Sequence, residues 1–280
     1  MNNSMISAAA SMGAMQRQLD ILADNIANIN TDGYKGKKAV FEDILTSVQP
    51  QPKDFEQPGR RSPLGLTLGW GTRVAGQTLD MSQGPLKETG NSTDVAIEGN
   101  ALFEVRTGMS LDSARAFTRQ GAFQLSPLAS GDSILLTNTG YPVVADDGGT
   151  DTFVEVPAGY QLTIGADGAL TAKSADGTDQ VELGALKLGQ AARPELLQAA
   201  ADNLFAVPEN VNADEVVQAI AAAPGAAGGV AIRQGYLEQS NVDLTSEISD
   251  LINVQRAYQL NSRALSSADQ MMQMATNLRG

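Results

Sequence analysis

Seam-forming residues recur at alternating steps of three and four at both ends of this 280-residue chain. Such steps bring the pattern back every seven residues, which is the narrow seam of a coiled coil rather than the broader stripe of a globular surface helix. The N-terminal set is Met5, Ala8, Met12, Met15, Leu19, Leu22, Ile26 and Ile29, and the C-terminal set is Leu251, Val254, Tyr258, Asn261, Leu265, Ala268, Met272 and Ala275. The pattern predicts two helices, at about 4–29 and 243–278, that pack together along their seams.

The flanking residues support these boundaries. Asn2, Asn3 and Ser4 offer oxygen atoms that could cap the first helix, and the turn formers of 30–33 would end it. Asp243 is placed to cap the second helix, with Glu247 in its positively polarised first turn.

Between the helices the sequence indicates β-structure. Four prolines at 50, 52, 58 and 63 mark an extended linker, and short runs of Val, Ile, Leu, Phe and Thr alternate with turn signals from about 66 to 207. Asp-Gly pairs at 147–148, 167–168 and 176–177 predict hairpin turns. The small residues of 219–229 predict a flexible loop outside the core.

We therefore expect an α+β fold with a discontinuous organisation. Residues 1–35 and 240–280 would form a paired-helix assembly domain, 36–85 an extended linker region, and 86–239 a β-rich outer domain. One two-helix seam leaves other helix faces uncovered, and isolated helices are marginal in water. We expect the ends to be mobile in the monomer and ordered within a many-chain tube.

Composition argues against most chemical functions. The chain has no histidine and no cysteine, which removes Ser-His-Asp and Cys-His catalysis and thiolate zinc sites. No pair of carboxylates stands out for glycosidase-type chemistry. We expect no enzyme activity and no cofactor or metal. The formal net charge of −13 disfavours nucleic acid and anionic membrane surfaces, and no apolar run could span a bilayer. The start of the chain also lacks the pattern of a cleaved signal peptide.

Three local motifs have ordinary structural explanations. The glycine spacing of 71–78 matches a phosphate-binding loop, but Gln77 replaces its lysine, which favours a turn or strand pair. The acidic glycine loop 146–151 lacks the ligand spacing of an EF-hand, which favours a solvated hairpin turn over a Ca²⁺ site. Lys35, Lys37 and Lys38 suggest a solvated helix end rather than an anion site.

Five segments of the chain together resemble the bacterial flagellar rod and hook proteins. They are Leu22–Lys35, Gly90–Gly99, Phe117–Phe123, Gly235–Asp243 and Val254–Ala264. The signature positions in them are Asn25, Asn28, Gly33, Tyr34, Asp94, Gly99, Ser240, Asn241, Gln255, Arg256 and Tyr258. Segments 39–45 and 68–74 most resemble the distal-rod members of this family.

The resemblance implies a structural subunit that stacks helically into an axial rod and transmits torque from the motor to the hook. Its partners would be further copies of itself, neighbouring rod and hook proteins, and the flagellar type III export apparatus. Its location would be the extracytoplasmic basal body, reached without a cleaved signal. A proximal-rod or hook component of the same family is one alternative, and a secreted adhesin or binding module is another.

Overall fold

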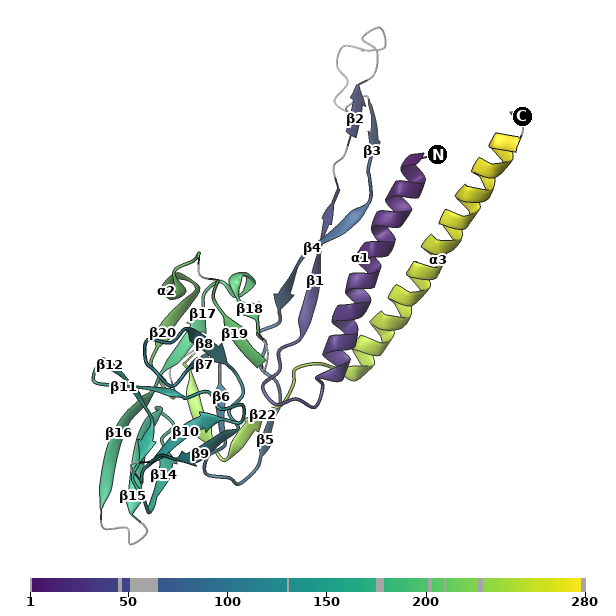
Figure 1. Cartoon of the computed structure of the whole chain (residues 1–280). Helices are drawn as coiled ribbons and strands as arrows, with labels where there is room; N and C mark the ends of the chain where they lie inside the picture. The colour runs from purple at the N-terminus through teal and green to yellow at the C-terminus, as the bar shows by residue number, and fades with distance from the viewer. Residues whose placement is uncertain are drawn as a thin grey trace. The chain divides into compact units, whose positions relative to one another are not determined.

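The structure is a computed structural model that carries helices at both ends and strands between them (Figure 1), so the predicted α+β class is confirmed. The residues that it describes are 2–44, 47–50, 65–129, 131–174, 179–200, 203–208, 210–225 and 229–277. The chain forms two compact units. The helix unit contains residues 1–26, 37–78 and 243–280, and the strand unit contains residues 27–36 and 79–242.

The helix unit is built from two long helices and a narrow β-ribbon. The helices are α1 (Asn2–Ala27) and α3 (Leu244–Asn277). The ribbon pairs β1 (Lys37–Asp43) with β4 (Thr72–Leu79) and, beyond them, β2 (Ser47–Pro50) with β3 (Gly65–Leu68). In Figure 1 the ribbon runs alongside α1.

Both predicted helices are confirmed, with small changes at their ends. The Asp243 carboxylate accepts a hydrogen bond from the Thr245 amide at 3.0 Å, so the predicted cap of α3 is confirmed. Asn2, Asn3 and Ser4 lie inside α1, because the helix already includes residue 2, so their predicted role as N-caps was wrong. Ile29 lies beyond the end of α1, in the turn that follows it.

The segment 36–85, expected to be an extended linker, is largely paired strand where the structure describes it. The backbone amide of Ile44 donates to the Gly71 carbonyl at 2.8 Å, which extends the pairing beyond the ends of β1 and β4. The prolines at 52, 58 and 63 lie outside the described residues. Residues 37–78 belong to the same compact unit as the two helices.

The strand unit contains three larger sheets and two strand pairs. The six-stranded sheet has the order β18 (Gln198–Ala199), β19 (Leu204–Ala206), β8 (Arg115–Thr118), β7 (Leu102–Arg106), β17 (Leu188–Ala191) and β20 (Val217–Ile220). The five-stranded sheet has the order β12 (Thr150–Phe153), β11 (Val144–Asp147), β16 (Gln180–Leu186), β15 (Ala169–Ser174) and β14 (Tyr160–Ile164). The three-stranded sheet has the order β13 (Glu155–Val156), β10 (Ser133–Thr137) and β9 (Phe123–Pro127). The two strand pairs are β21 (Ala231–Gln234) with β6 (Val95–Glu98), and β22 (Tyr236–Glu238) with β5 (Leu86–Glu88). Two short helices, η2 (Pro194–Leu196) and α2 (Ala213–Val216), complete the unit.

Strand β7 is buried on both faces and joins the two hydrophobic clusters of this unit. Phe103 and Val105 point into the larger cluster, whereas Leu102 points into the smaller one with Phe117. Phe103 meets Phe123 edge to face, with ring centroids 5.1 Å apart. The alternation of side chains along a strand therefore places one short segment in both cores.

The turn predictions were largely correct. The pairs 147–148 and 167–168 lie in the hairpins β11–β12 and β14–β15. The pair 176–177 falls outside the described residues. The prediction of a loop outside the core at 219–229 was wrong at its start, because Ala219 and Ile220 pair with β17 and Ala222 packs against the larger core cluster; residues 226–228 lie outside the described residues.

Candidate functional site

The predicted seam residues occupy the less exposed face of each terminal helix. Leu22 and Val254 are buried. The other predicted seam side chains inside the two helices are partly buried, namely Met5, Met12, Met15, Leu19, Ile26, Leu251, Tyr258, Leu265 and Met272. Ile29 is also partly buried but follows the helix.

Polar contacts fix the relative direction of α1 and α3. The Asn25 side-chain amide donates to the Glu247 carboxylate at 3.3 Å near one end of the pair. Further along, the Gln16 amide donates to the Tyr258 hydroxyl at 3.2 Å, and the Asn261 amide lies 3.4 Å from the Met15 sulfur. Residue numbers rise on one helix as they fall on the other, so the helices run antiparallel.

A second face of α1, which the seam pattern did not indicate, packs against the ribbon. Ala14 is 4 % exposed although it lies off the seam. On the same face, a Cβ added at Gly71 would lie 3.0 Å from the Ser7 carbonyl oxygen and 3.3 Å from the Ala10 Cβ. The φ of Gly71 is +104°, a region that disfavours larger residues. Small residues on both elements therefore allow the ribbon to approach the helix.

Asn25 is the signature residue with the clearest role in the helix unit. Its side chain is 2 % exposed, donates to the Lys37 carbonyl at 2.9 Å and accepts from the Lys37 amide at 2.9 Å. It thus satisfies both polar groups of the first ribbon residue and reaches Glu247 as well. Burial raises the pKa of Glu247, while the Asn25 hydrogen bond opposes that rise.

Several apolar side chains around α3 remain exposed in the single chain. Leu244, Ile248 and Ile252 follow one another at steps of four and are each more than two-fifths exposed. Leu260 is 64 % exposed. Met271 and Met274 continue the exposed apolar surface toward the C-terminus.

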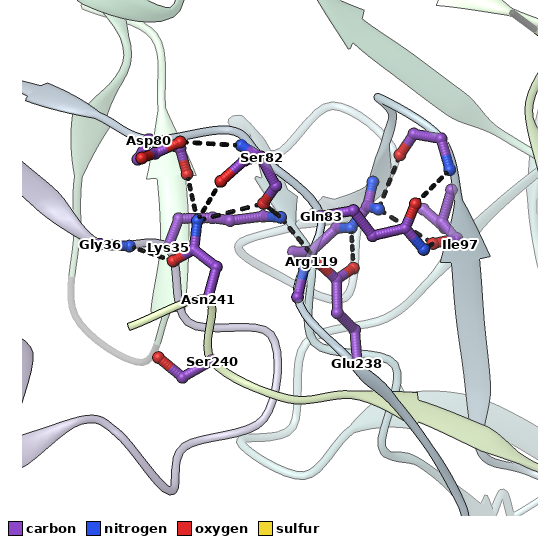
Figure 2. A network of polar contacts seen from close by, with 12 residues as sticks. Lys35, Gly36, Asp80, Ser82, Gln83, Ile97, Arg119, Glu238, Ser240 and Asn241 are labelled. Atoms are coloured by element: carbon purple, nitrogen blue, oxygen red, sulfur yellow. Dashed lines mark hydrogen bonds and ion pairs between the residues drawn. The ribbon is translucent and has the colours of Figure 1, made fainter. Parts of the chain in front are cut away.

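The strand unit contains a buried polar network that sequence reasoning did not identify (Figure 2). The side chains of Lys35, Arg119 and Glu238 are each at most 2 % exposed. The Glu238 carboxylate pairs with the Lys35 ammonium at 2.8 Å and with the Arg119 guanidinium. Burial first, and then the Arg119 charge, lower the pKa of Lys35, while Glu238 acts in the opposite sense. Lys35 is therefore an internal ion rather than part of the predicted solvated helix end.

The other two lysines of that cluster differ from Lys35. Lys37 is partly buried and pairs with Asp24 at 2.5 Å, and Lys38 is exposed. Residues 72–79 form strand β4, so the predicted strand is present in place of a phosphate-binding loop. The acidic segment 146–151 forms the turn of the β11–β12 hairpin, as predicted. No cluster of three or more His, Cys, Asp or Glu suited to a metal occurs among the described residues.

Several signature residues lie in or beside the buried network. Gly33 donates its amide to the Glu238 carbonyl, and Gly99 offers its carbonyl to Arg119. Asn241 binds the backbone of Asp80 and Ser82. Of the remaining signature positions, Tyr34, Asp94 and Ser240 are buried, Asn28 and Tyr258 are partly buried, and Gln255 and Arg256 are exposed.

Comparison with known proteins agrees with this arrangement of terminal helices around a β-rich middle. Residues 7–35 match the model described as "Flagella basal body rod protein", and residues 233–278 match "Flagellar basal body rod FlgEFG protein C-terminal". Residues 96–172 match "Flagellar hook protein FlgE/F/G D1 domain". The "Flagellar basal-body rod protein FlgG" of Borreliella burgdorferi is 32 % identical over 100 % of this chain and 99 % of its own length. The chain belongs to the flagellar basal-body rod and hook protein family.

Other members of the family are similarly related. The "Flagellar basal-body rod protein FlgG" of Agrobacterium fabrum is 35 % identical over 94 % of each chain. The "Flagellar hook-basal body complex protein FlhP" of Bacillus subtilis is 30 % identical over the full length of both. In the part of the chain that the structure describes, neither terminal helix has an apolar stretch suited to crossing a membrane.

Proposed function

We propose that this chain is a structural subunit of the flagellar basal-body axial rod, of the distal-rod type. The observation that carries the proposal is full-length similarity to proteins named as flagellar basal-body rod protein FlgG. The location that follows is the basal body outside the cytoplasm. Its partners would be further copies of the same chain, neighbouring rod and hook proteins, and the flagellar type III export apparatus.

The two terminal helices would act together as the assembly domain, with their seams packed as an antiparallel coiled coil. The contacts of Asn25 with Glu247 and of Gln16 with Tyr258 support one register. In that register Leu22 faces Leu251 and Leu19 faces Val254, and Met15 lies between Tyr258 and Asn261.

Cross-linking tests this register, and the absence of cysteine from the chain makes the test clean. The pair Leu19→Cys and Val254→Cys should be joined by a short bismaleimide reagent. The control pair Leu19→Cys and Asn261→Cys is displaced by one heptad, about 10 Å along the helix, and should react far less. Equal yields for the two pairs would contradict the proposed register.

Contacts between subunits would use exposed apolar side chains of α3. Burying a side chain such as Leu260 in a neighbouring copy contributes about 1.5–3 kcal/mol, and the gain recurs in every subunit. We expect both helices to fluctuate in the monomer and to become fully ordered on assembly. Strong protection of both termini from hydrogen exchange in the monomer would contradict this expectation.

The position along the flagellum can be tested by labelling. Ser110 lies in an exposed turn between β7 and β8, so Ser110→Cys introduces a single accessible thiol. Maleimide-gold on isolated hook-basal bodies should mark the end of the rod next to the hook. Gold along the hook, or on the part of the rod nearest the cell, would support the hook or proximal-rod alternative instead.

A further inference from the structure

Four passages of the chain lead from one unit to the other, at 26/27, 36/37, 78/79 and 242/243. Three of them are flanked, within the strand unit, by residues that bind one another. We call Lys35, Gly36, Asp80, Ser82, Arg119, Glu238 and Asn241 the junction cluster; these residues are shown in Figure 2. Their contacts bring together segments that are up to about 200 residues apart in the sequence.

Asn241 makes the bonds that join the three segments. It accepts from the Gly36 amide at 2.8 Å and donates to the carbonyls of Asp80 at 2.8 Å and Ser82 at 3.1 Å. The Asp80 amide in turn donates to the Gly36 carbonyl at 2.7 Å. One side-chain amide therefore connects the segment that follows α1, the segment that follows the ribbon, and the segment that leads into α3.

Glu238 is the second link, and it carries charge. Among the described residues it is the only carboxylate within ion-pair distance of the buried Lys35 and Arg119 side chains. It also accepts from the Gly84 amide at 2.8 Å, and its own carbonyl accepts from the Gly33 amide at 2.7 Å. Two buried cations without this carboxylate would be strongly unfavourable, because charges in a protein interior require a partner.

The backbone around Glu238 fits closely into the rest of the unit. Strand β22 pairs with β5, and the Gln239 amide donates to the Pro85 carbonyl at 2.9 Å. A Cβ added at Gly84 would lie 2.1 Å from the Gln239 carbonyl oxygen, so only glycine permits this approach. Leu237 and Ser240 are buried as well.

We propose that residues 236–242 act as a closing strap, so that the strand unit is complete only when Glu238 and Asn241 join segments 33–36 and 80–84 in a single step. Before the strap docks, Lys35 and Arg119 lack their carboxylate partner. The segments beside three of the passages then also lack the hydrogen bonds that Glu238 and Asn241 make between them. Closure therefore couples the region after α1 to the region before α3. This inference concerns folding of the single chain and does not depend on the proposed role in the rod.

Hydrogen exchange at four backbone amides tests the proposal on the full-length monomer. Gly33 and Gly84 donate to Glu238, Gly36 donates to Asn241, and Asp80 donates to Gly36. If the strap opens as one body, these amides exchange at the rate of a single opening event in the wild type. Asn241→Ala should then speed all four by a similar factor of about tenfold or more, including the three amides that do not bond to Asn241.

Asn91→Ala is the matched control, because it removes the same side chain from an exposed turn of the same unit, where Asn91 binds Asp94. It should leave all four rates unchanged. Gly84→Ala provides an independent disturbance of the strap and should raise the rates at Gly33, Gly36 and Asp80 together. The proposal is overturned if Asn241→Ala accelerates exchange of the Gly36 amide alone. It is also overturned if Gly84→Ala accelerates exchange at residue 84 but leaves the exchange rates of the Gly36 and Asp80 amides unchanged.

Discussion

Replacing Glu238 by glutamine should destabilise the strand unit far more than removing the lysine that it neutralises. The buried triad holds two cations and one anion. Glu238→Gln keeps the size and an oxygen acceptor but leaves both cations uncompensated. Removing one partner of a buried ion pair costs about 3–5 kcal/mol, which is a large part of the roughly 5–15 kcal/mol that stabilises a typical domain.

Lys35→Met has the opposite effect on the charge balance. It leaves Arg119 and Glu238 as a neutral pair, and Met fills a volume similar to that of the lysine stem. The Ser82 carbonyl, which Lys35 contacts at 2.7 Å, also accepts from Asn241 and so keeps a partner. We expect a loss below about 2 kcal/mol, since a single hydrogen bond contributes about 1 kcal/mol. In the double variant, the removal of Lys35 should recover part of the loss caused by Glu238→Gln.

Urea unfolding of the purified chain measures these differences. Near-ultraviolet circular dichroism reports on Tyr141 and Tyr160, which pack against the larger core cluster of the strand unit. The double-mutant cycle then gives the interaction between positions 35 and 238. Equal losses of stability for Lys35→Met and Glu238→Gln, or a double variant less stable than Glu238→Gln alone, would show that the charge balance of the triad does not control its stability.

Burial lowers the pKa of Lys35 in the folded chain, where Arg119, Glu238 and Asp80 are the charges that face it. Between that pKa and the usual 10.5 the unfolded chain therefore binds more protons, so the wild type should gain stability relative to Lys35→Met as the pH rises through this window. A difference in urea midpoint that stays constant with pH would contradict this assignment. Phe103→Ala should cost about 3–5 kcal/mol in thermal or urea unfolding, since Phe103 is fully buried against Phe123. Leu260→Asp should leave the unfolding of the monomer nearly unchanged, because this residue is 64 % exposed, but should abolish rod assembly and motility. The control Gln259→Asp, at the neighbouring exposed position, should assemble normally. Motile cells with Leu260→Asp would exclude the surface around Leu260 as an interface between subunits.

The elements that could be predicted are those with local causes. The two helices follow from spacing that repeats within one turn or two, and the cap at Asp243 follows from a single side chain beside the first turn. The hairpins at 147–148 and 167–168 follow from turn chemistry that involves adjacent residues only. Each of these signals can be read without knowing the rest of the chain.

The features that could not be predicted depend on residues far apart in the sequence. Lys35 resembles its neighbours Lys37 and Lys38, and its burial follows from a carboxylate 203 residues further along the chain. The ribbon was missed because its strands are separated by a proline-rich segment and become stable by packing on α1. Ala14 and Gly71 carry no periodic signal, and their smallness acquires meaning only when the helix and the ribbon meet. Asn241 is one of the signature positions, but the resemblance did not indicate the bonds that its side chain makes.

Electron microscopy of basal bodies from cells lacking this chain tests whether the chain is a building block of the axial rod. Without the chain, rods should end short of the hook and carry neither hook nor filament, and the wild-type chain should restore full-length rods. Complete rods with hooks and filaments in the deletion cells would contradict it.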